Sequence, residues 1–134
     1  MILDTSAVMS ILNDESDARI FAEAIFSAES IKMSAATFFE CSMVVDGKRS
    51  TELSWSFDDF MQQAEVEIIP LSISQAHLAR TAFRAYGRGS GSPARLNFGD
   101  CFAYALAAET GEPLLFKGND FVHTDIRDGL RERS

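Results

Sequence analysis

The sequence predicts a single α/β domain in which helices flank a central, mostly parallel β-sheet. The first observation is that short apolar runs alternate with longer segments whose apolar residues recur at helical spacing, a pattern typical of βα units. The second is a length of 134 residues, the size of one domain. The third is a hydrophobic content of 46% with eleven phenylalanines, which is enough to fill a core. We therefore expect residues 1–134 to form one domain, with a charged tail over about 127–134.

The first half of the chain predicts two strands, each followed by two helices. In the helix predicted over 51–64, Leu53, Phe57 and Phe60 share one apolar stripe, and Trp55 lies off it. Trp55 is therefore a candidate for a partner surface, with packing against a neighbouring helix as the alternative. The expected elements are strand 1–3, helices 6–13 and 16–28, strand 30–34, and helices 36–48 and 51–64.

The second half predicts further strands and helices around one long loop. Ser74 is the expected N-cap of a helix that runs to about Tyr86. Gly111 is the expected stop of a later helix, and a glycine- and serine-rich loop lies between the two helices. The expected elements are strand 66–71, helix 75–86, loop 87–95, helix 99–110, strand 112–116 and a short edge strand over 123–126.

Charge and composition exclude several classes of protein. A formal net charge of −8 argues against broad electrostatic binding of nucleic acid, yet it leaves room for an enzyme that handles phosphates through bound cations. No apolar run approaches the ~18–20 residues of a membrane span. No basic segment of a signal peptide precedes the first strand, so we expect a cytoplasmic protein. Cys41 and Cys101 lack the spacing of a disulfide framework or a zinc site, and we expect both in the core.

Four acidic residues are predicted to lie at one edge of the sheet. In a parallel α/β sheet, ligands bind outside the carboxyl ends of the strands. Asp4 directly follows the first strand, and Glu40 lies in an early turn of the helix after the second. Asp100 begins the helix that leads into the fourth strand, and Asp120 follows that strand by a few residues. Segments far apart in the sequence thus each bring one carboxylate to the same rim.

Each acid has a local explanation, but the four together require another. Asp4 fits a helix N-cap and Glu40 fits a capping box. Asp100 fits the favourable end of a helix dipole, and Asp120 fits a turn. Two carboxylates ~4 Å apart repel by about 1–4 kcal/mol, so several such pairs outweigh these local gains. Neutralising cations are needed, and oxygen ligands without histidine or thiolate suit Mg²⁺ or Mn²⁺. Two such ions clamp the attacking and leaving oxygens of a phosphoryl displacement.

Several stretches of the sequence resemble the PIN-domain ribonucleases, and within these the VapC toxins of bacterial toxin–antitoxin pairs. They are MILDTSAV, FFE, TDI and the long block LNFGDCFAYALAAETGEPLLFKGNDF. The resemblance implies a parallel sheet flanked by helices, and hydrolysis of RNA phosphodiester bonds that depends on Mg²⁺ or Mn²⁺. It also implies a metal site formed by Asp4, Glu40 and Asp100, which Asp120 completes or supports. Ser6 matches a position that often helps to hold such a site through its hydroxyl.

One departure from the family pattern concerns the second metal ion. Many relatives carry a further acid at the position of Gly118, two residues before the final Asp-Phe. Asn119 is neutral, but it can accept a hydrogen bond or hold a water. The departure predicts a second ion that binds weakly, or only with substrate present, and it leaves the role of Asp120 open.

The resemblance also implies partners. VapC toxins form homodimers, and each is inhibited by a VapB-type antitoxin whose tail blocks the acidic pocket. The substrate would be RNA, with tRNA and rRNA as candidate classes. Arginines suited to contact RNA phosphates recur before and within the glycine-rich loop, and a solvated surface is the alternative explanation for them. They are Arg80, Arg84, Arg88 and Arg95.

Other functions remain open. A receiver-like signalling domain has a similar length and an acidic pocket, but the strand over 66–71 ends without a phosphoacceptor aspartate and Lys117 is only a partial match. A dehalogenase-type phosphatase needs a DxD motif where this chain has DTS. A catalytically degenerate PIN-like binding module would fit Gly118, although three intact acids speak against it. His77 and His123 each stand alone, and we expect neither to act in catalysis.

Overall fold

Four short parallel strands hold the fold together, in the order β3-β2-β1-β4 across the sheet. The central strand β1 (Ile2–Leu3) lies between β2 (Lys32–Ser34) and β4 (Leu114–Leu115), and β3 (Glu67–Ile69) lies at one edge. The chain is seen here in a computed structural model that describes residues 1–131. The parallel sheet predicted from the sequence is confirmed.

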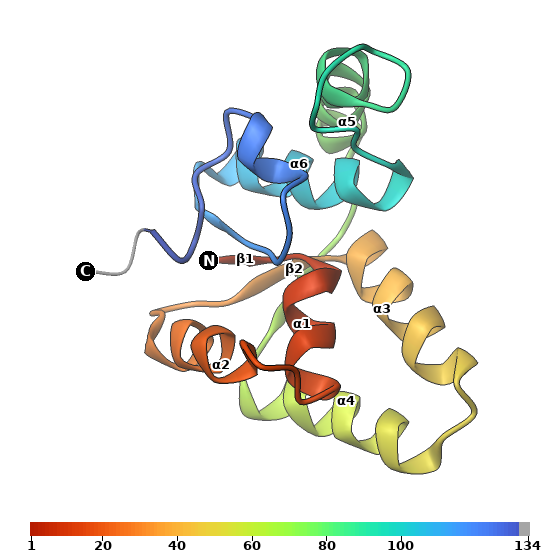
Figure 1. The fold of residues 1–134 in the computed structure, drawn as a ribbon, viewed down its shortest axis with the longest axis vertical. Helices are drawn as coiled ribbons and strands as arrows, with labels where there is room; N and C mark the ends of the chain where they lie inside the picture. Colours follow the sequence, from red (N-terminus) through yellow and green to blue (C-terminus); the bar gives the residue numbers. More distant parts are fainter. Residues whose placement is uncertain (132–134) are drawn as a thin grey trace.

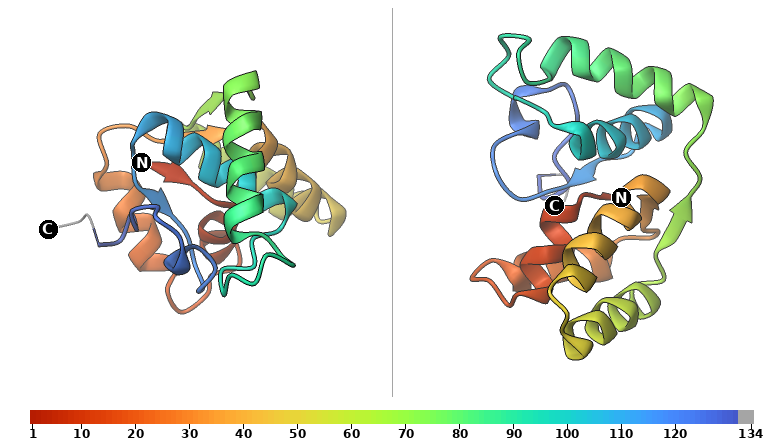
Figure 2. Two further views of the ribbon diagram at one scale, coloured as in Figure 1. Left: turned by 90° about the horizontal axis from the view of Figure 1, so that it is seen from above. Right: turned by 90° about the vertical axis from the view of Figure 1, so that its right-hand side faces the viewer.

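Helices connect the strands and cover both faces of the sheet (Figure 1). Two views at right angles agree that α5 and α6 lie on one face, and α1 to α4 lie on the other (Figure 2). All connections between consecutive strands run through helices, so each strand enters the sheet in the same direction. The helices are α1 (Thr5–Leu12), α2 (Ala18–Ser27), α3 (Ala35–Gly47), α4 (Thr51–Gln63), α5 (Ile73–Tyr86), α6 (Phe98–Thr110) and the 3₁₀ helix η1 (Phe121–His123).

Two apolar cores form because successive residues of a strand face opposite sides of the sheet. Ile2 and Leu114 belong to the core under α5 and α6. Leu3 and Leu115 belong to the core that packs against α1 to α4. All four side chains are fully buried. The end of β1 is therefore fixed from both faces, and the residue that follows it, Asp4, is held in a defined place.

Most predicted helix boundaries differ from the observed ones by one or two residues, and the starts of α5 and α6 show why. The hydroxyl of Ser72, and not that of Ser74, accepts the backbone N–H of Gln75 at 3.0 Å, so α5 begins at Ile73. This earlier start buries Gln75 and leaves Ile73 exposed, a pattern that the serine spacing alone did not reveal. Similarly, Asn97 caps α6, and this helix begins one residue before the predicted position.

The predicted edge strand over 123–126 is also wrong. Thr124 bonds locally instead, because its hydroxyl donates to the Phe121 carbonyl at 2.7 Å and accepts the Ile126 N–H at 3.3 Å. Such local bonds compete with strand pairing. Farther along the chain, Asp128 forms an isolated parallel β-bridge with Leu114.

The chain that follows lies against the molecule. Gly129 is buried, and Leu130 packs on the core shared with α1 to α4. Of the charged tail expected over 127–134, residues 127–131 thus follow the sheet edge, and 132–134 lie outside the described residues. In the described part of the chain, none of the helices combines the length and the hydrophobicity that crossing a bilayer requires.

Candidate active site

Asp4 is a buried carboxylate at the carboxyl end of β1. It caps α1 with extended backbone angles, φ −93° and ψ 155°, and only 4% of the residue is exposed. Its Oδ2 atom accepts the backbone N–H of Ser6 at 3.0 Å and the Ser6 hydroxyl at 2.5 Å. Burial raises the pKa of Asp4, although both bonds from Ser6 lower it, and the nearby negative charge of Glu40 raises it further.

Ser6 connects the ends of two strands. Its hydroxyl donates to Asp4 and accepts the backbone N–H of Lys117 at 2.9 Å. Lys117 follows β4 by two positions, so Ser6 bonds the start of α1 to the chain that leaves the fourth strand. The supporting position predicted for Ser6 therefore lies beside Asp4.

Glu40 reaches the same edge from α3. The Thr5 hydroxyl donates a hydrogen bond to Glu40 Oε1, and the Cys41 thiol contacts the Thr5 oxygen at 3.5 Å. On its other side, the Glu40 carboxylate lies against Gly99, where a Cβ atom would overlap Oε2. Neither Thr5 nor Gly99 was predicted from the sequence. The sequence features that pointed to them were the position of Thr5 directly after Asp4 in DTS and that of Gly99 directly before Asp100.

Asp100 lies in the first turn of α6, where it forms a capping box with Asn97. Each residue's side chain accepts the other's backbone N–H, at 3.0 Å for Asp100 and 2.9 Å for Asn97. Burial raises the pKa of Asp100 to about 6, and the negative charges of Asp4, Asp120 and Glu40 add to this shift. These mutual effects place all four carboxylates in one electrostatic neighbourhood, which we call the acid cluster (Asp4, Glu40, Asp100 and Asp120).

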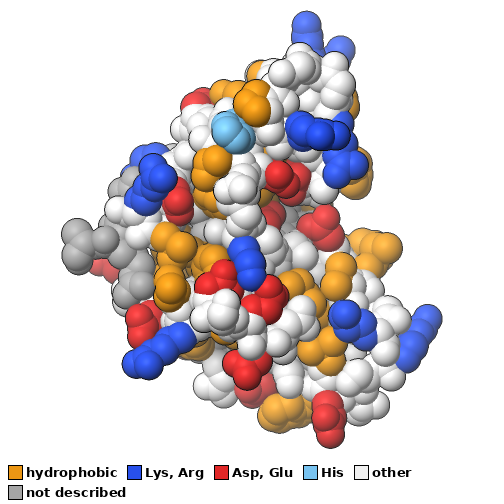
Figure 3. All heavy atoms as spheres, viewed as in Figure 1, with side chains coloured by type: hydrophobic (Ala, Val, Ile, Leu, Met, Phe, Trp, Pro, Cys, Tyr) orange, Lys and Arg blue, Asp and Glu red, His pale blue; other side chains and the backbone are white. Residues whose placement is uncertain are grey.

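The acid cluster faces a hollow of the surface. Asp and Glu side chains gather where the molecule opens between the start of α6 and α3 (Figure 3). Asp120 and Asn119 are both exposed in the loop between β4 and η1, and Asp120 caps η1 without a side-chain hydrogen bond. Of the four acids, Asp120 is thus held by the fewest local bonds.

The donor chemistry of this hollow fits a hard divalent cation. The acid cluster supplies only carboxylate oxygens, which Mg²⁺ and Mn²⁺ prefer. The two nearby thiols stay protonated, because burial raises the pKa of Cys41 to about 12 and that of Cys101 to about 11. In residues 1–131, however, no three acidic, histidine or cysteine side chains already surround a point where an ion would bind. The carboxylates instead accept hydrogen bonds from Ser6, Thr5 and Asn97.

The predicted RNA-contact arginines lie outside the acid cluster. All four are exposed, and none forms an ion pair with another described residue. Lys and Arg side chains gather over the end of the molecule where α5 and the following loop lie (Figure 3). The four are Arg80, Arg84, Arg88 and Arg95. Trp55 lies elsewhere, on α4, with 66% of the residue exposed beside a shallow groove.

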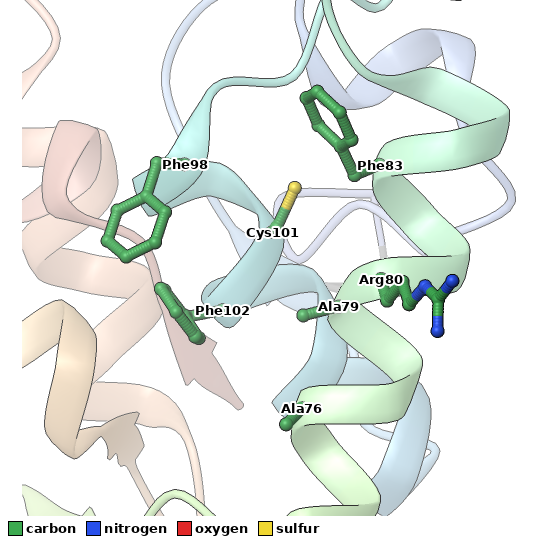
Figure 4. Close-up of a pocket in the computed structure, with 7 residues that line it drawn as sticks. All are labelled: Ala76, Ala79, Arg80, Phe83, Phe98, Cys101 and Phe102. Carbon is green, nitrogen blue, oxygen red and sulfur yellow. The ribbon is translucent and has the colours of Figure 1, made fainter.

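An apolar groove of about 480 Å³, which the sequence analysis did not predict, adjoins the acid cluster between α5 and α6 (Figure 4). Phe98 and Phe102 lie on either side of Asp100 along α6. Their rings pack edge to face, with a distance of 4.8 Å between the ring centroids. Phe98 is 81% exposed. The guanidinium of Arg80 points away from these rings (Figure 4). The groove is lined by Ala76, Ala79, Arg80, Phe83, Phe98, Cys101 and Phe102.

A four-stranded parallel sheet with acids gathered at its carboxyl edge defines the class of protein, a small α/β domain of the PIN type. The family model of the PIN domain matches residues 1–127. Ribonuclease VapC28 of Mycobacterium tuberculosis is 48% identical over 133 residues, which cover 99% of this chain and 100% of that protein. Ribonuclease VapC42 of the same species is 44% identical over 127 residues, which cover 95% of this chain and 97% of that protein.

A solved structure shows the same fold. The toxin VapC20 of M. tuberculosis, described as cleaving the sarcin–ricin loop, superposes with a TM-score of 0.70 over 93% of this chain and 95% of that chain, at 13% identity. The chain therefore belongs to the PIN-domain family, in its VapC ribonuclease branch. The resemblance seen in the sequence is confirmed, and family membership replaces the receiver-like alternative.

Gly99→Ala is expected to displace Glu40 without unfolding the protein. The added methyl group meets only the far end of the Glu40 side chain, which is flexible, so the carboxylate moves and its bond with Thr5 breaks. Because such supporting contacts contribute about 10–100-fold to metal affinity, calorimetric titration should show Mn²⁺ binding weakened by about tenfold or more. Gly47→Ala is the matched control, since this helical glycine of α3 has open space around it. Equal Mn²⁺ affinities in the two variants would contradict the prediction.

Asp100→Asn is expected to stabilise the metal-free protein at pH 8 and to have no such effect at pH 4. The raised pKa of about 6 means that the charged carboxylate costs more in the folded state than in the unfolded chain. This cost is absent below the ordinary pKa and complete above the raised one. The shift corresponds to at most about 3 kcal/mol, which solvent screening reduces to about 1–2 kcal/mol.

Urea unfolding between pH 4 and pH 8 measures this difference. Asn at this position keeps an oxygen for the N–H of Asn97, so the helix cap is preserved. Asp58→Asn, a change at an exposed acid of α4, is the control and should follow the wild-type profile. A variant at position 100 that is less stable than wild type at pH 8 would contradict the expected repulsion.

Proposed function

We propose that this chain is a Mg²⁺- or Mn²⁺-dependent endoribonuclease, the toxin of a VapBC pair, which hydrolyses phosphodiester bonds in RNA. The observation that supports this most directly is the acid cluster, in which burial and neighbouring carboxylates raise the pKa of Asp4 and of Asp100. Burying Asp4 beside other carboxylates costs free energy unless a cation neutralises them. The names of the curated relatives, VapC28 and VapC42 ribonucleases, favour the same activity.

In this proposal, Asp4, Glu40 and Asp100 hold the cation and Asp120 completes the site. A divalent cation bound there would supply an activated water and would neutralise charge on the phosphate and the leaving oxygen. Ser6 keeps the Asp4 carboxylate oriented, and the hydroxyl of Thr5 does the same for Glu40. The loop that carries Asn119 and Asp120 is exposed, so substrate can reach both residues. Cleavage would leave a 5′-phosphate and a 3′-hydroxyl.

The exposed arginines account for how an acidic chain would bind a polyanion. Arg80 and Arg84 lie one turn apart on α5, and Arg88 and Arg95 follow in the loop that leads to α6. Contacts from such residues position a strand without reading its sequence. The related fold of VapC20, described as cleaving the sarcin–ricin loop, makes rRNA a candidate substrate beside tRNA.

Partners and cellular location follow from the same proposal. A VapB-type antitoxin would inhibit the enzyme, and a cationic side chain from its tail would be stabilised in the acid cluster. A homodimer would cover part of the exposed apolar surface. Trp55 on α4 offers one such surface, because its side chain lies over a shallow groove formed with Thr51, Glu52 and Ser56. The toxin would act in the cytoplasm, where its RNA substrates are found.

A catalytically degenerate binding module is the second candidate. Gly118 favours this second candidate, because many relatives are expected to have an acid at its position. The backbone there has a positive φ of +102°. The intact acid cluster favours the enzyme instead. The two differ in one measurement, cleavage of RNA in the presence of Mg²⁺ or Mn²⁺.

Asp4→Asn is expected to abolish RNA cleavage while the fold is kept. The amide retains an oxygen that can accept the bonds from Ser6, but it removes the negative charge that would hold the cation. Purified wild type and variant would be incubated with total bacterial RNA and Mn²⁺, and the new 5′ ends would be sequenced. Asp14→Asn is the matched control, because Asp14 is exposed and asparagine tolerates its positive φ of 52°. A wild type that never cuts RNA, with or without Mn²⁺, would support the binding module.

The Arg84/Arg88 double alanine variant is expected to bind RNA more weakly and with a shallower salt dependence. Each phosphate contact that is lost reduces the slope of log affinity against log salt by about 0.7 for a single strand. Fluorescence anisotropy with a labelled RNA between about 50 and 200 mM salt, a fourfold range, measures the slope. Arg19→Ala is the control, since Arg19 is exposed and already paired with Glu23 at 3.1 Å. An unchanged slope would remove both arginines from the interface.

A further inference from the structure

Lys117 joins the end of β4 to a distant part of the chain through its side chain. Its ammonium group pairs with Glu15 and with Asp17, the latter at 3.3 Å. Both acids lie in the connection between α1 and α2, about a hundred positions earlier in the sequence. We call Lys117, Glu15 and Asp17 the Lys117 clamp.

The acids of the Lys117 clamp are themselves held in place. Asp17 Oδ1 also accepts the hydroxyl of Ser10 at 2.5 Å, and Ser10 is fully buried at the end of α1. The backbone N–H of Glu15 donates to the Ser10 carbonyl at 3.0 Å. The lysine therefore binds an anchor that is fixed to α1, the helix that Asp4 caps.

The backbone of Lys117 meets the acid cluster on the opposite side. Its N–H donates to Ser6 Oγ at 2.9 Å, and Ser6 in turn donates to Asp4 Oδ2 at 2.5 Å. A backbone N–H can only donate, so the Ser6 oxygen must accept from Lys117 and point its own proton toward Asp4. The position of one amide group thus determines the direction of the hydrogen bond that orients the buried carboxylate.

We propose that Lys117 is a positioning residue, whose ion pairs with Glu15 and Asp17 hold its amide against Ser6 and so orient Asp4 for cation binding. The inference rests on the proposed function, because it assigns Asp4 to the cation site. Gly118, Asn119 and Asp120, which follow Lys117, are exposed and Gly118 has φ +102°, so the next buried residue of the chain is Phe121. Exposed ion pairs contribute little to overall stability, so the effect of the clamp is local.

Lys117→Met is the primary test, because methionine keeps the backbone N–H and most of the side-chain length but removes the charge. In the metal-free variant, hydrogen exchange at amide 117 should be at least tenfold faster than in wild type. Calorimetric titration should show Mn²⁺ affinity lowered by about tenfold, the size expected when a group behind a metal ligand is lost. Lys117→Arg, which keeps the charge, should restore most of both properties.

Lys32→Met is the matched control. Lys32 forms a comparable ion pair with Glu112, which also binds the N-terminal amine, but this cluster lies at the amino end of the strands. The variant should match Lys117→Met in its loss of thermal stability and should bind Mn²⁺ like wild type. Equal losses of Mn²⁺ affinity at positions 32 and 117 would overturn the proposal, because the effect would then be general destabilisation.

Ser6→Ala separates the proposed route from others. If Lys117 acts through the Ser6 hydroxyl, Lys117→Met should cause no further loss of Mn²⁺ affinity in a Ser6→Ala background. A second tenfold loss in the double variant would overturn the proposal, as would wild-type amide exchange in Lys117→Met. A wild type that neither binds Mn²⁺ nor cuts RNA would refute the proposed function instead, and amide exchange would still decide whether the clamp holds residue 117.

Discussion

Repulsion between carboxylates that the fold brings together is the constraint on which the rest of this structure depends. The acid cluster draws its members from the ends of β1 and β4 and from the starts of α3 and α6. Burial raises the pKa of Asp4 and of Asp100, and neighbouring negative charges raise both further. Three of the four carboxylates accept hydrogen bonds from local donors: Asp4 from Ser6, Glu40 from Thr5 and Asp100 from Asn97. Under the proposed function, a bound cation would neutralise the remaining repulsion.

The central strand explains why the site does not relax by moving apart. β1 has only two residues, yet Ile2 is buried in one core and Leu3 in the other. Moving Asp4 away from the acid cluster would therefore expose apolar surface on both faces of the sheet, at about 25 cal/mol per Å². The two hydroxyl residues that follow, Thr5 and Ser6, are carried by the same rigid start of α1. Packing thus holds the charges together, and short polar side chains orient them.

The sequence was sufficient to predict what depends on local pattern and on the edge rule for parallel sheets. The alternation of strands and helices and the parallel sheet follow from these, and the rim of Asp4, Glu40 and Asp100 was predicted by the same edge rule. Contacts that depend on how helices pack were not predictable, and the fit of Glu40 against Gly99 is an example, since it joins α3 to α6. The edge strand expected over 123–126 failed because Thr124 offers the backbone closer partners than the sheet does. Ser72 and Ser74 are equivalent caps by sequence, and burial of Gln75 decides between them.

The acid cluster and the separate arginines together suggest how a chain of net charge −8 would bind RNA. An empty acid cluster repels the phosphate that must approach it, whereas a cation there turns the same hollow into an attractive one. Cation binding and RNA binding would then be coupled, and linkage requires each to strengthen the other by the same factor. This coupling gives a physical meaning to Gly118, where many relatives carry an acid. Under the proposed function, a site with one carboxylate fewer would hold a second ion more weakly, and a phosphate of the RNA would offer a further oxygen ligand.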